Sequence, residues 1–166
     1  MQRFMLAVAA LAWALTAAGC GHGPARAQEA DLKIITHGER VDLESHLASG
    51  KYTVVDFYAA WCPPCRVVGP ALERLARVES RRLAVRKVDI VDWTMPVVEQ
   101  HGIESLPHLM LFAPDGRRLA NGDEVYAALR ELFGEAAREL VEAGQAAGAE
   151  APPGTPATDA IGNTVL

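Results

Sequence analysis

Apolar residues along this chain follow two different spacings, and segments with one spacing alternate with segments with the other. Short runs rich in β-branched and aromatic residues, which are typical of strands, lie at 32–36, 52–58, 83–90, 108–113 and 117–120. Segments with apolar residues three or four positions apart, which are typical of helices, lie at 42–48, 62–79, 95–100 and 123–143. This alternation predicts an α/β domain, in which helices flank a mixed sheet on both faces.

Individual residues add detail to this pattern. The segment 52–58 is almost continuously apolar, as expected of a central strand that is covered on both faces. Pro70 lies inside the helix predicted for 62–79 and should kink it. The sequence Pro114-Asp115-Gly116 predicts a turn that joins the last two strands as a hairpin. Residues 144–166 are rich in Ala, Gly, Pro and Thr and offer little apolar surface, so we expect a disordered tail.

The N-terminus carries the pattern of an export signal. Residues 4–18 form an uncharged apolar run after Arg3, and this run is shorter than the ~20 residues needed to span a bilayer. Ala25-Arg26-Ala27 is a small-residue site at which a signal peptidase could cleave. Alternatively, the segment 15–20 resembles a bacterial lipobox, in which Cys20 would be lipidated and become the mature N-terminus. We favour the lipobox because it directly follows the apolar run.

The rest of the chain is predicted to form one acidic domain. We assign 1–27 to the signal with its linker and 28–143 to the folded domain, which is long enough for a single core. The formal net charge of the whole chain is -5. The segment 1–27 holds two arginines and no acidic residue, so the domain alone is more acidic still. This charge argues against a nucleic acid as the partner.

Two of the three cysteines form a Cys-x-x-Cys motif at the predicted end of the buried strand. A thiol at the start of a helix faces unpaired backbone N–H groups and the positive end of the helix dipole, and both favour the nucleophilic thiolate. Cys62 is expected to be such an accessible, acidic thiol. Cys65 lies one turn further on, close enough to form a disulfide with it. Pro63 and Pro64 should stiffen the loop, but they also remove two N–H donors.

Two other uses of the motif are disfavoured by the rest of the sequence. A structural zinc site needs two more cysteine or histidine ligands at short spacing, whereas His101 and His108 are predicted on different elements. A static disulfide across so small a loop would restrict the unfolded chain little. We therefore expect redox chemistry at Cys62 and Cys65, with neither a metal site nor a cofactor.

The segment 54–65, VVDFYAAWCPPC, closely resembles the active-site segment of the thioredoxin family. Pro70 stands where thioredoxins carry a helix-kinking proline, and Lys87 matches a family lysine near a buried carboxylate. The segment 101–107 resembles the one that ends in the family's cis-proline. The similarity extends over about 32–140. It implies a thioredoxin fold with a mixed central sheet of four to five strands.

The resemblance also implies roles for individual residues. Cys62 would attack a substrate disulfide, and Cys65 would resolve the mixed disulfide that forms. Asp56 would be the buried carboxylate that takes up and returns the proton of Cys65. Burial should raise the pKa of Asp56 towards neutrality, as a proton relay needs, and Lys87 could moderate that rise.

Further residues are implied to bind the substrate. Pro107 would be the cis-proline that faces the cysteine pair, and it would present the backbone of Leu106 for strand-like pairing with a substrate segment. Trp61 would shield the cysteines and, with Pro63 and Pro64, line the docking surface.

Two positions near this surface depart from the family pattern. His108 stands where threonine is common. It could tune the thiolate of Cys62 or make a pH-sensitive contact, and an ordinary strand-end histidine is an equal alternative. The stretch 119–123 is shorter than the family's usual loop, which borders the substrate groove, so the choice of substrate is left open.

These observations predict a thiol–disulfide oxidoreductase of the periplasm or cell envelope, with or without a lipid anchor on Cys20. The Cys-x-Pro-Cys pattern favours the reduction of protein disulfides. The electrons would come from a membrane donor, because soluble cytoplasmic reductases cannot reach an exported protein. Three alternatives stay open: a disulfide oxidase or isomerase of the same fold, a metallochaperone that binds Cu(I) through both thiolates, and a docking module with incidental redox activity.

Overall fold

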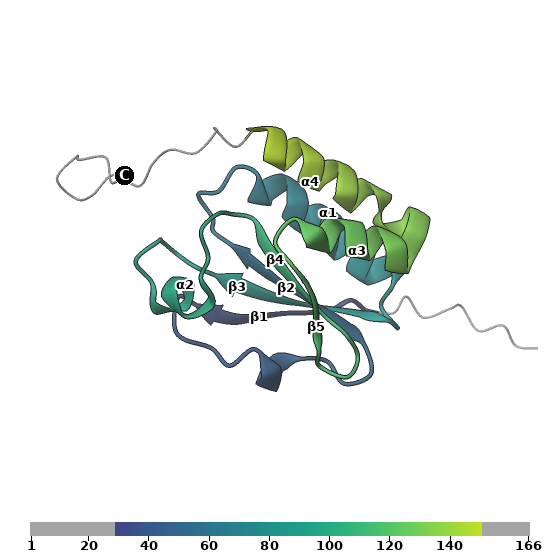
Figure 1. Cartoon of the computed structure of the whole chain (residues 1–166), viewed down its shortest axis with the longest axis horizontal. Helices are drawn as coiled ribbons and strands as arrows, with labels where there is room; N and C mark the ends of the chain where they lie inside the picture. The colour runs from purple at the N-terminus through teal and green to yellow at the C-terminus, as the bar shows by residue number, and fades with distance from the viewer. Residues whose placement is uncertain (1–28, 151–166) are drawn as a thin grey trace, which may run out of the picture.

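The computed structural model describes residues 29–150, and its centre is a five-stranded sheet (Figure 1). The strands are β1 (Asp31–His37), β2 (Tyr52–Tyr58), β3 (Leu83–Asp89), β4 (His108–Phe112) and β5 (Arg118–Asn121). Their order is β1-β3-β2-β4-β5. The strands β1, β3 and β2 are parallel, whereas β4 is antiparallel to β2 and β5 is antiparallel to β4. The prediction of a mixed sheet is confirmed.

The export signal predicted for 1–27, including Cys20, lies outside the described residues, and so does the end of the predicted tail. Among residues 29–150, no helix combines the length and the apolar character that crossing a bilayer requires. The location of the protein therefore stays a prediction from the sequence.

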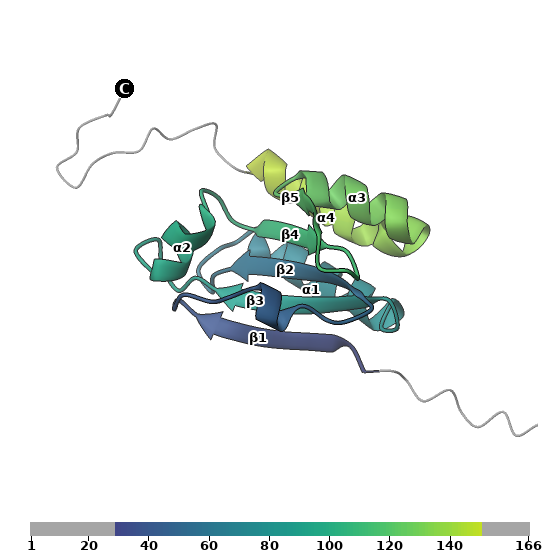
Figure 2. The ribbon, with the colours of Figure 1, turned by 60° about the horizontal axis from the view of Figure 1, so that its bottom comes forward.

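Helices flank both faces of the sheet. They are α1 (Cys65–Val78), α2 (Pro96–His101), α3 (Glu124–Phe133) and α4 (Arg138–Glu150), with two short 3-10 helices, η1 (Glu44–His46) and η2 (Gly134–Ala137). Figure 1 shows α1, α3 and α4 together on one side of the sheet and η1 on the other. In the rotated view of Figure 2, α2 lies beyond one end of the strands.

Successive side chains of β2 contribute to two separate apolar cores, because neighbouring residues of a strand point to opposite faces. Val54 belongs to the core beneath α1, α3 and α4. Val55 and Phe57 belong to the other core, which also contains Val97 of α2. By the same alternation, Asp56 lies on the side of Val54. A carboxyl group is therefore placed beneath the three-helix layer.

The helix predicted for 42–48 is wrong apart from the single turn of η1. Leu43 is buried as its apolar character suggested, but the chain around it is held by contacts to distant residues. The Gln100 amide accepts a hydrogen bond from the Val41 N–H (2.9 Å) and donates one to the Val41 carbonyl (2.8 Å). The Arg86 guanidinium donates to the His46 carbonyl (2.7 Å). These bonds stabilise a loop in place of a regular helix.

The single helix predicted for 123–143 is also wrong, because it divides at Gly134. Gly134 has a positive φ of 55°, which glycine adopts without the steric cost of a Cβ atom. The chain then turns, and α4 packs on α1, where the Arg74 guanidinium pairs with the Glu139 carboxylate. The helix α4 continues to Glu150, so the first part of the predicted disordered tail is helical.

Small residues explain why this extension was missed. Ala147, within the predicted tail, is buried in the core beneath α4. Gly144 lies against the ring of Tyr126, where an added Cβ would come within 2.4 Å of a ring carbon. Such residues carry little apolar surface of their own, but they allow two helices to approach closely.

Candidate active site

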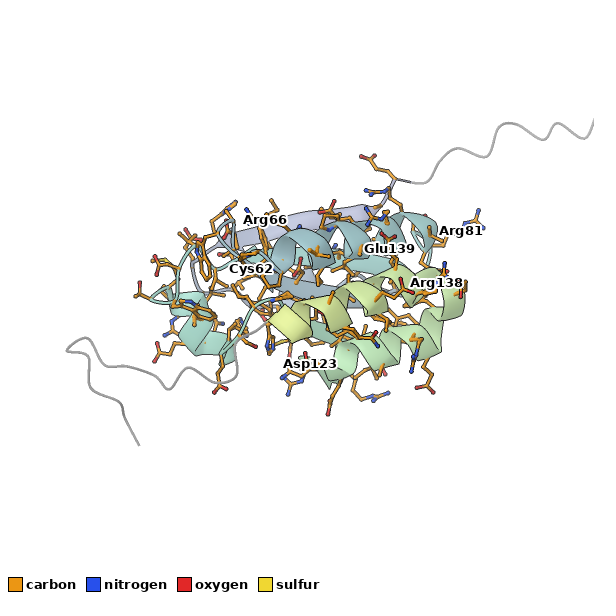
Figure 3. The ribbon with its side chains drawn as sticks, turned by 90° about the horizontal axis from the view of Figure 1, so that it is seen from above. Cys62, Arg66, Arg81, Asp123, Arg138 and Glu139 are labelled. Carbon is orange, nitrogen blue, oxygen red and sulfur yellow. A yellow bond between two sulfur atoms is a disulfide. The ribbon has the colours of Figure 1, made fainter. Side chains whose placement is uncertain are left out.

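The two cysteines lie at the connection from β2 to α1, and a disulfide joins their sulfur atoms. Figure 3 shows Cys62 next to one end of α1. The helix begins at Cys65 rather than at Cys62, because the preceding residues form a turn in which the Cys62 N–H donates to the Ala59 carbonyl (3.1 Å). The N–H of Cys65 donates a hydrogen bond to the Cys62 sulfur, with an N···S distance of 3.2 Å. The start of the helix thus directs a donor at this sulfur, which favours its thiolate form.

The disulfide is less accessible than the sequence predicted. Cys62 is only 2% exposed and Cys65 only 7% exposed. Both belong to the core that β2 shares with α2, and Tyr58 and Leu106 pack against this core. The motif specifies where the sulfur atoms lie along the chain, but not which distant side chains cover them. A partner must therefore reach the pair past the residues at its rim.

The predicted substrate-binding residues lie at this end of the sheet. The peptide bond between Leu106 and Pro107 is cis, as the resemblance implied. The strand β4 begins immediately afterwards, and its first residue pairs with Phe57 near the end of β2. Pro107 and the cysteine pair therefore share one edge of the molecule. In the linking turn Pro63 is exposed, whereas Pro64 is half-buried.

His108 is positioned by two neighbours. Its Nε2 atom lies 3.0 Å from the Oδ1 atom of Asn121, the last residue of β5. Its ring meets the ring of Phe57 edge-on, with 5.9 Å between the centroids. These contacts account for the orientation of the imidazole, while its influence on the Cys62 thiolate stays a prediction.

Trp61 is part of an exposed aromatic pair that the sequence analysis missed. Trp61 and Trp93 are 48% and 46% exposed, and their ring centroids are 5.8 Å apart. The indole N–H of Trp61 donates to the carbonyl of Val91 (2.5 Å). Val91 has a φ of 59°, which is uncommon for a β-branched residue. A tryptophan between the polar residues Asp92 and Thr94 was the sequence feature from which an exposed aromatic side chain could have been predicted.

Asp56 is buried, as predicted, at 1% exposure. Its Oδ2 atom has no hydrogen-bond partner among the described residues, and the nearest cation is the ammonium of Lys87, 3.9 Å away. Burial raises the pKa of Asp56 to about 6, which Lys87 opposes and Glu73 reinforces. The predicted direction of the pKa change and the moderating role of Lys87 both agree with this arrangement.

Glu73 is a member of this cluster that the sequence did not reveal. Its carboxylate accepts a hydrogen bond from the Lys87 ammonium (3.0 Å). Glu73 lies on α1, one helical turn after Gly69. Nothing in the local pattern distinguishes Glu73 from an exposed acidic residue of an amphipathic helix.

Comparisons with known proteins agree with this architecture. The thioredoxin family model matches residues 35–132, which is more than half of the chain. A thioredoxin-like protein of Fusarium culmorum is 37% identical over 102 residues, which cover 60% of this chain and 84% of that protein. The thioredoxin of Mycolicibacterium smegmatis is 38% identical over 90 residues, covering 52% of this chain and 80% of that protein.

Among solved structures, a mutant thioredoxin from Halobacterium salinarum is similar with a TM-score of 0.47 and 29% sequence identity. The match covers 63% of this chain and 90% of that structure. The segment matched by the family model contains β2, the disulfide, α1 and the cis-proline, whereas α4 lies beyond it. The chain therefore belongs to the thioredoxin family, and Cys62 and Cys65 form its redox-active disulfide.

Proposed function

We propose that this protein reduces disulfide bonds in other proteins, using Cys62 and Cys65 as a dithiol. The observation that carries this proposal is the closed disulfide at the start of α1, in which the N–H of Cys65 donates to the Cys62 sulfur. A hydrogen bond of this kind stabilises a thiolate at position 62, so Cys62 is the better nucleophile and leaving group of the two.

The reaction begins from the reduced protein. The Cys62 thiolate attacks one sulfur of the substrate disulfide, and a mixed disulfide forms. The other substrate sulfur leaves as a thiolate and takes up a proton. The Cys62 sulfur is thereby oxidised and the departing substrate sulfur is reduced, so half of the two-electron transfer is complete.

The second step releases the substrate. The carboxylate of Asp56 accepts the proton of Cys65, and the Cys65 thiolate attacks the Cys62 sulfur. The Cys62–Cys65 disulfide forms, and the remaining substrate sulfur leaves and is protonated. The substrate has gained two electrons, and a dithiol donor must restore the reduced protein.

The proposed location is the cell envelope, supported by the apolar run at 4–18. A membrane-embedded dithiol protein is then the expected electron donor. The mass of the mature N-terminus tests the export route, since a lipid-bearing Cys20 and a free Gln28 give different values.

A redox titration of the disulfide against glutathione tests the direction of the reaction. For a reductase we expect a reduction potential near the value typical of thioredoxins, about −270 mV. A potential near −120 mV, as found in strongly oxidising exchange proteins, would instead support the disulfide oxidase alternative. The fraction of disulfide is measured by alkylation and mass spectrometry.

The exposed pair of Trp61 and Trp93 is proposed to dock apolar side chains that flank the substrate disulfide. Replacing Trp93 with alanine should lower kcat/KM for a protein disulfide about five- to tenfold, because aromatic side chains dominate binding at such surfaces. The same substitution should leave the rate with hydroxyethyl disulfide unchanged, since that molecule is too small to span the pair.

A Val78→Ala variant is the matched control for this experiment. Val78 is 71% exposed, but it lies at the far end of α1 from Cys65. Its substitution should change neither kcat/KM for the protein disulfide nor the rate with hydroxyethyl disulfide. Equal losses with both substrates in the Trp93 variant would show that Trp93 supports the disulfide itself and does not select proteins.

A further inference from the structure

The ammonium group of Lys87 lies between two carboxyl groups and bonds only one of them. Its Nζ atom is 3.0 Å from Oε1 of Glu73, within hydrogen-bond distance. The same atom is 3.9 Å from Oδ2 of Asp56, which is too far for a hydrogen bond. The cation nearest to the buried carboxyl therefore gives its hydrogen bond to a different acid.

Other groups around Lys87 also contact its ammonium in this position beside Glu73. A Cβ atom added to Gly69 would lie 3.6 Å from the Lys87 ammonium, which is ordinary contact distance, so the ammonium lies directly beside α1. The ammonium also lies 4.6 Å from the ring centroid of Tyr58, within cation–π range. Glu73 is more exposed than Lys87, and Asp56 is the most deeply buried of the three. The carboxylate that accepts the hydrogen bond of Lys87 is therefore the more exposed of the two.

We propose that Glu73 is a positioning residue for disulfide exchange, which takes the hydrogen bond of Lys87 and leaves the Asp56 carboxylate free to receive the proton of Cys65. The inference deepens the proposed function and rests on it for the role of Asp56. Without Glu73, Lys87 could approach Asp56 and form a direct ion pair. A carboxylate in a direct ion pair accepts protons poorly.

Electrostatics of the neighbouring groups agree with this arrangement. Lys87 stays charged, because its hydrogen bond to Glu73 and the charges of both acids outweigh the effect of burial and raise its pKa. Tyr58 on β2 and Tyr126 on α3 also face this region, and burial raises the pKa of each, so both stay neutral. The charges that act on Asp56 come from Lys87 and Glu73.

A carboxyl NMR titration of Asp56 in the disulfide form tests the inference. Glu73→Gln removes a negative charge and weakens the hydrogen bond that holds Lys87 away from Asp56. The midpoint of the Asp56 titration should therefore fall by about one pH unit. Lys87→Gln should raise the midpoint. In a Lys87→Gln background, the effect of Glu73→Gln should be smaller, because the part transmitted by Lys87 is lost.

Glu79→Gln is the matched control. Glu79 follows α1 directly and pairs with Arg82, so its substitution removes the same charge without touching Lys87. The Asp56 midpoint should not move in this variant. An unchanged or higher midpoint in Glu73→Gln would overturn the inference, and so would an equal fall in Glu79→Gln.

Kinetics separate this inference from the proposed function. The acid limb of the pH profile for mixed-disulfide resolution should move to lower pH in Glu73→Gln, in step with the NMR midpoint. If no variant reduces protein disulfides, the proposed function fails, while the titration still decides whether Glu73 positions Lys87. Glu73→Asp, which keeps the charge on a shorter side chain, should give an intermediate midpoint.

Discussion

Replacing Cys62 with serine is expected to lower the reduction of a protein disulfide about a thousandfold or more, to the rate of the added dithiol alone. A serine hydroxyl is not ionised at neutral pH, and its oxygen cannot form the mixed disulfide through which exchange proceeds. The rate is measured as the precipitation of reduced insulin in the presence of dithiothreitol. The hydrogen bond from the Cys65 N–H would then meet an oxygen in place of the Cys62 sulfur.

The matched variant is Cys65→Ser, which keeps the attacking sulfur but removes the resolving one. We expect it to accumulate a mixed disulfide with the substrate, visible as an adduct on a non-reducing gel and absent for Cys62→Ser. In cells of the source organism the same variant should trap the physiological partner for identification by mass spectrometry. Normal insulin reduction by Cys62→Ser would refute the proposed chemistry.

Replacing Asp56 with asparagine is expected to stabilise the disulfide form by about 3 kcal/mol at pH 7.5. Burial raises the pKa of Asp56 to about 6 in the folded protein, against an ordinary value of 3.8. Between these two values the folded protein holds a proton that the unfolded chain has released. Raising the pH through this interval therefore favours unfolding, and the ionised carboxylate destabilises the fold above it.

The pH dependence makes this prediction specific. Asparagine resembles the protonated acid, so the gain in stability should be largest above pH 6 and should disappear near pH 4. Urea unfolding of both disulfide forms at pH 4 and pH 7.5 provides the measurement. Removal of Asp56 does not leave Lys87 unpaired, because Glu73 still accepts its hydrogen bond. A gain that is equal at both pH values would contradict the assignment.

Asp31 offers a control of opposite sign. Burial tends to raise the pKa of Asp31, but the hydrogen bond and charge of Arg86, 2.9 Å away, outweigh burial and lower it. Its ionised form therefore stabilises the folded protein above pH 3.8, and this contribution is lost on acidification. Asp31→Asn should destabilise the protein at pH 7.5 and lose that effect at low pH.

These two carboxyl groups show how stability and activity diverge in this fold. The carboxylate of Asp31 accepts a hydrogen bond from the buried guanidinium of Arg86, as expected of a group that stabilises the fold. Asp56 is left without a hydrogen bond at Oδ2, and its nearest cation is turned towards Glu73. An acid retained at the expense of stability in the strand that leads to a redox pair is consistent with a proton relay. Asp56→Asn should accordingly be more stable but slower in releasing its substrate.

The sequence alone determined where the five strands lie along the chain and that the redox pair follows the second of them. The run 52–58 predicted a strand that is covered on both faces, so a motif directly after it was expected at the end of the sheet. An aspartate inside that run was expected to be buried, because both faces of such a strand are covered. The cis bond before Pro107 followed from the family resemblance, since X–Pro bonds are cis in only about 5–6% of cases.

The tertiary structure decided what surrounds these residues. Cys62 is buried by side chains from other parts of the chain, and Trp61 packs against the distant Trp93. Lys87 lies between two acids, Asp56 and Glu73, that come from different elements. The packing of α4 against α1 is another such contact. Periodicity informs only about neighbours within a turn of helix or a few strand positions, whereas the access to the sulfur and the basicity of Asp56 depend on the fold.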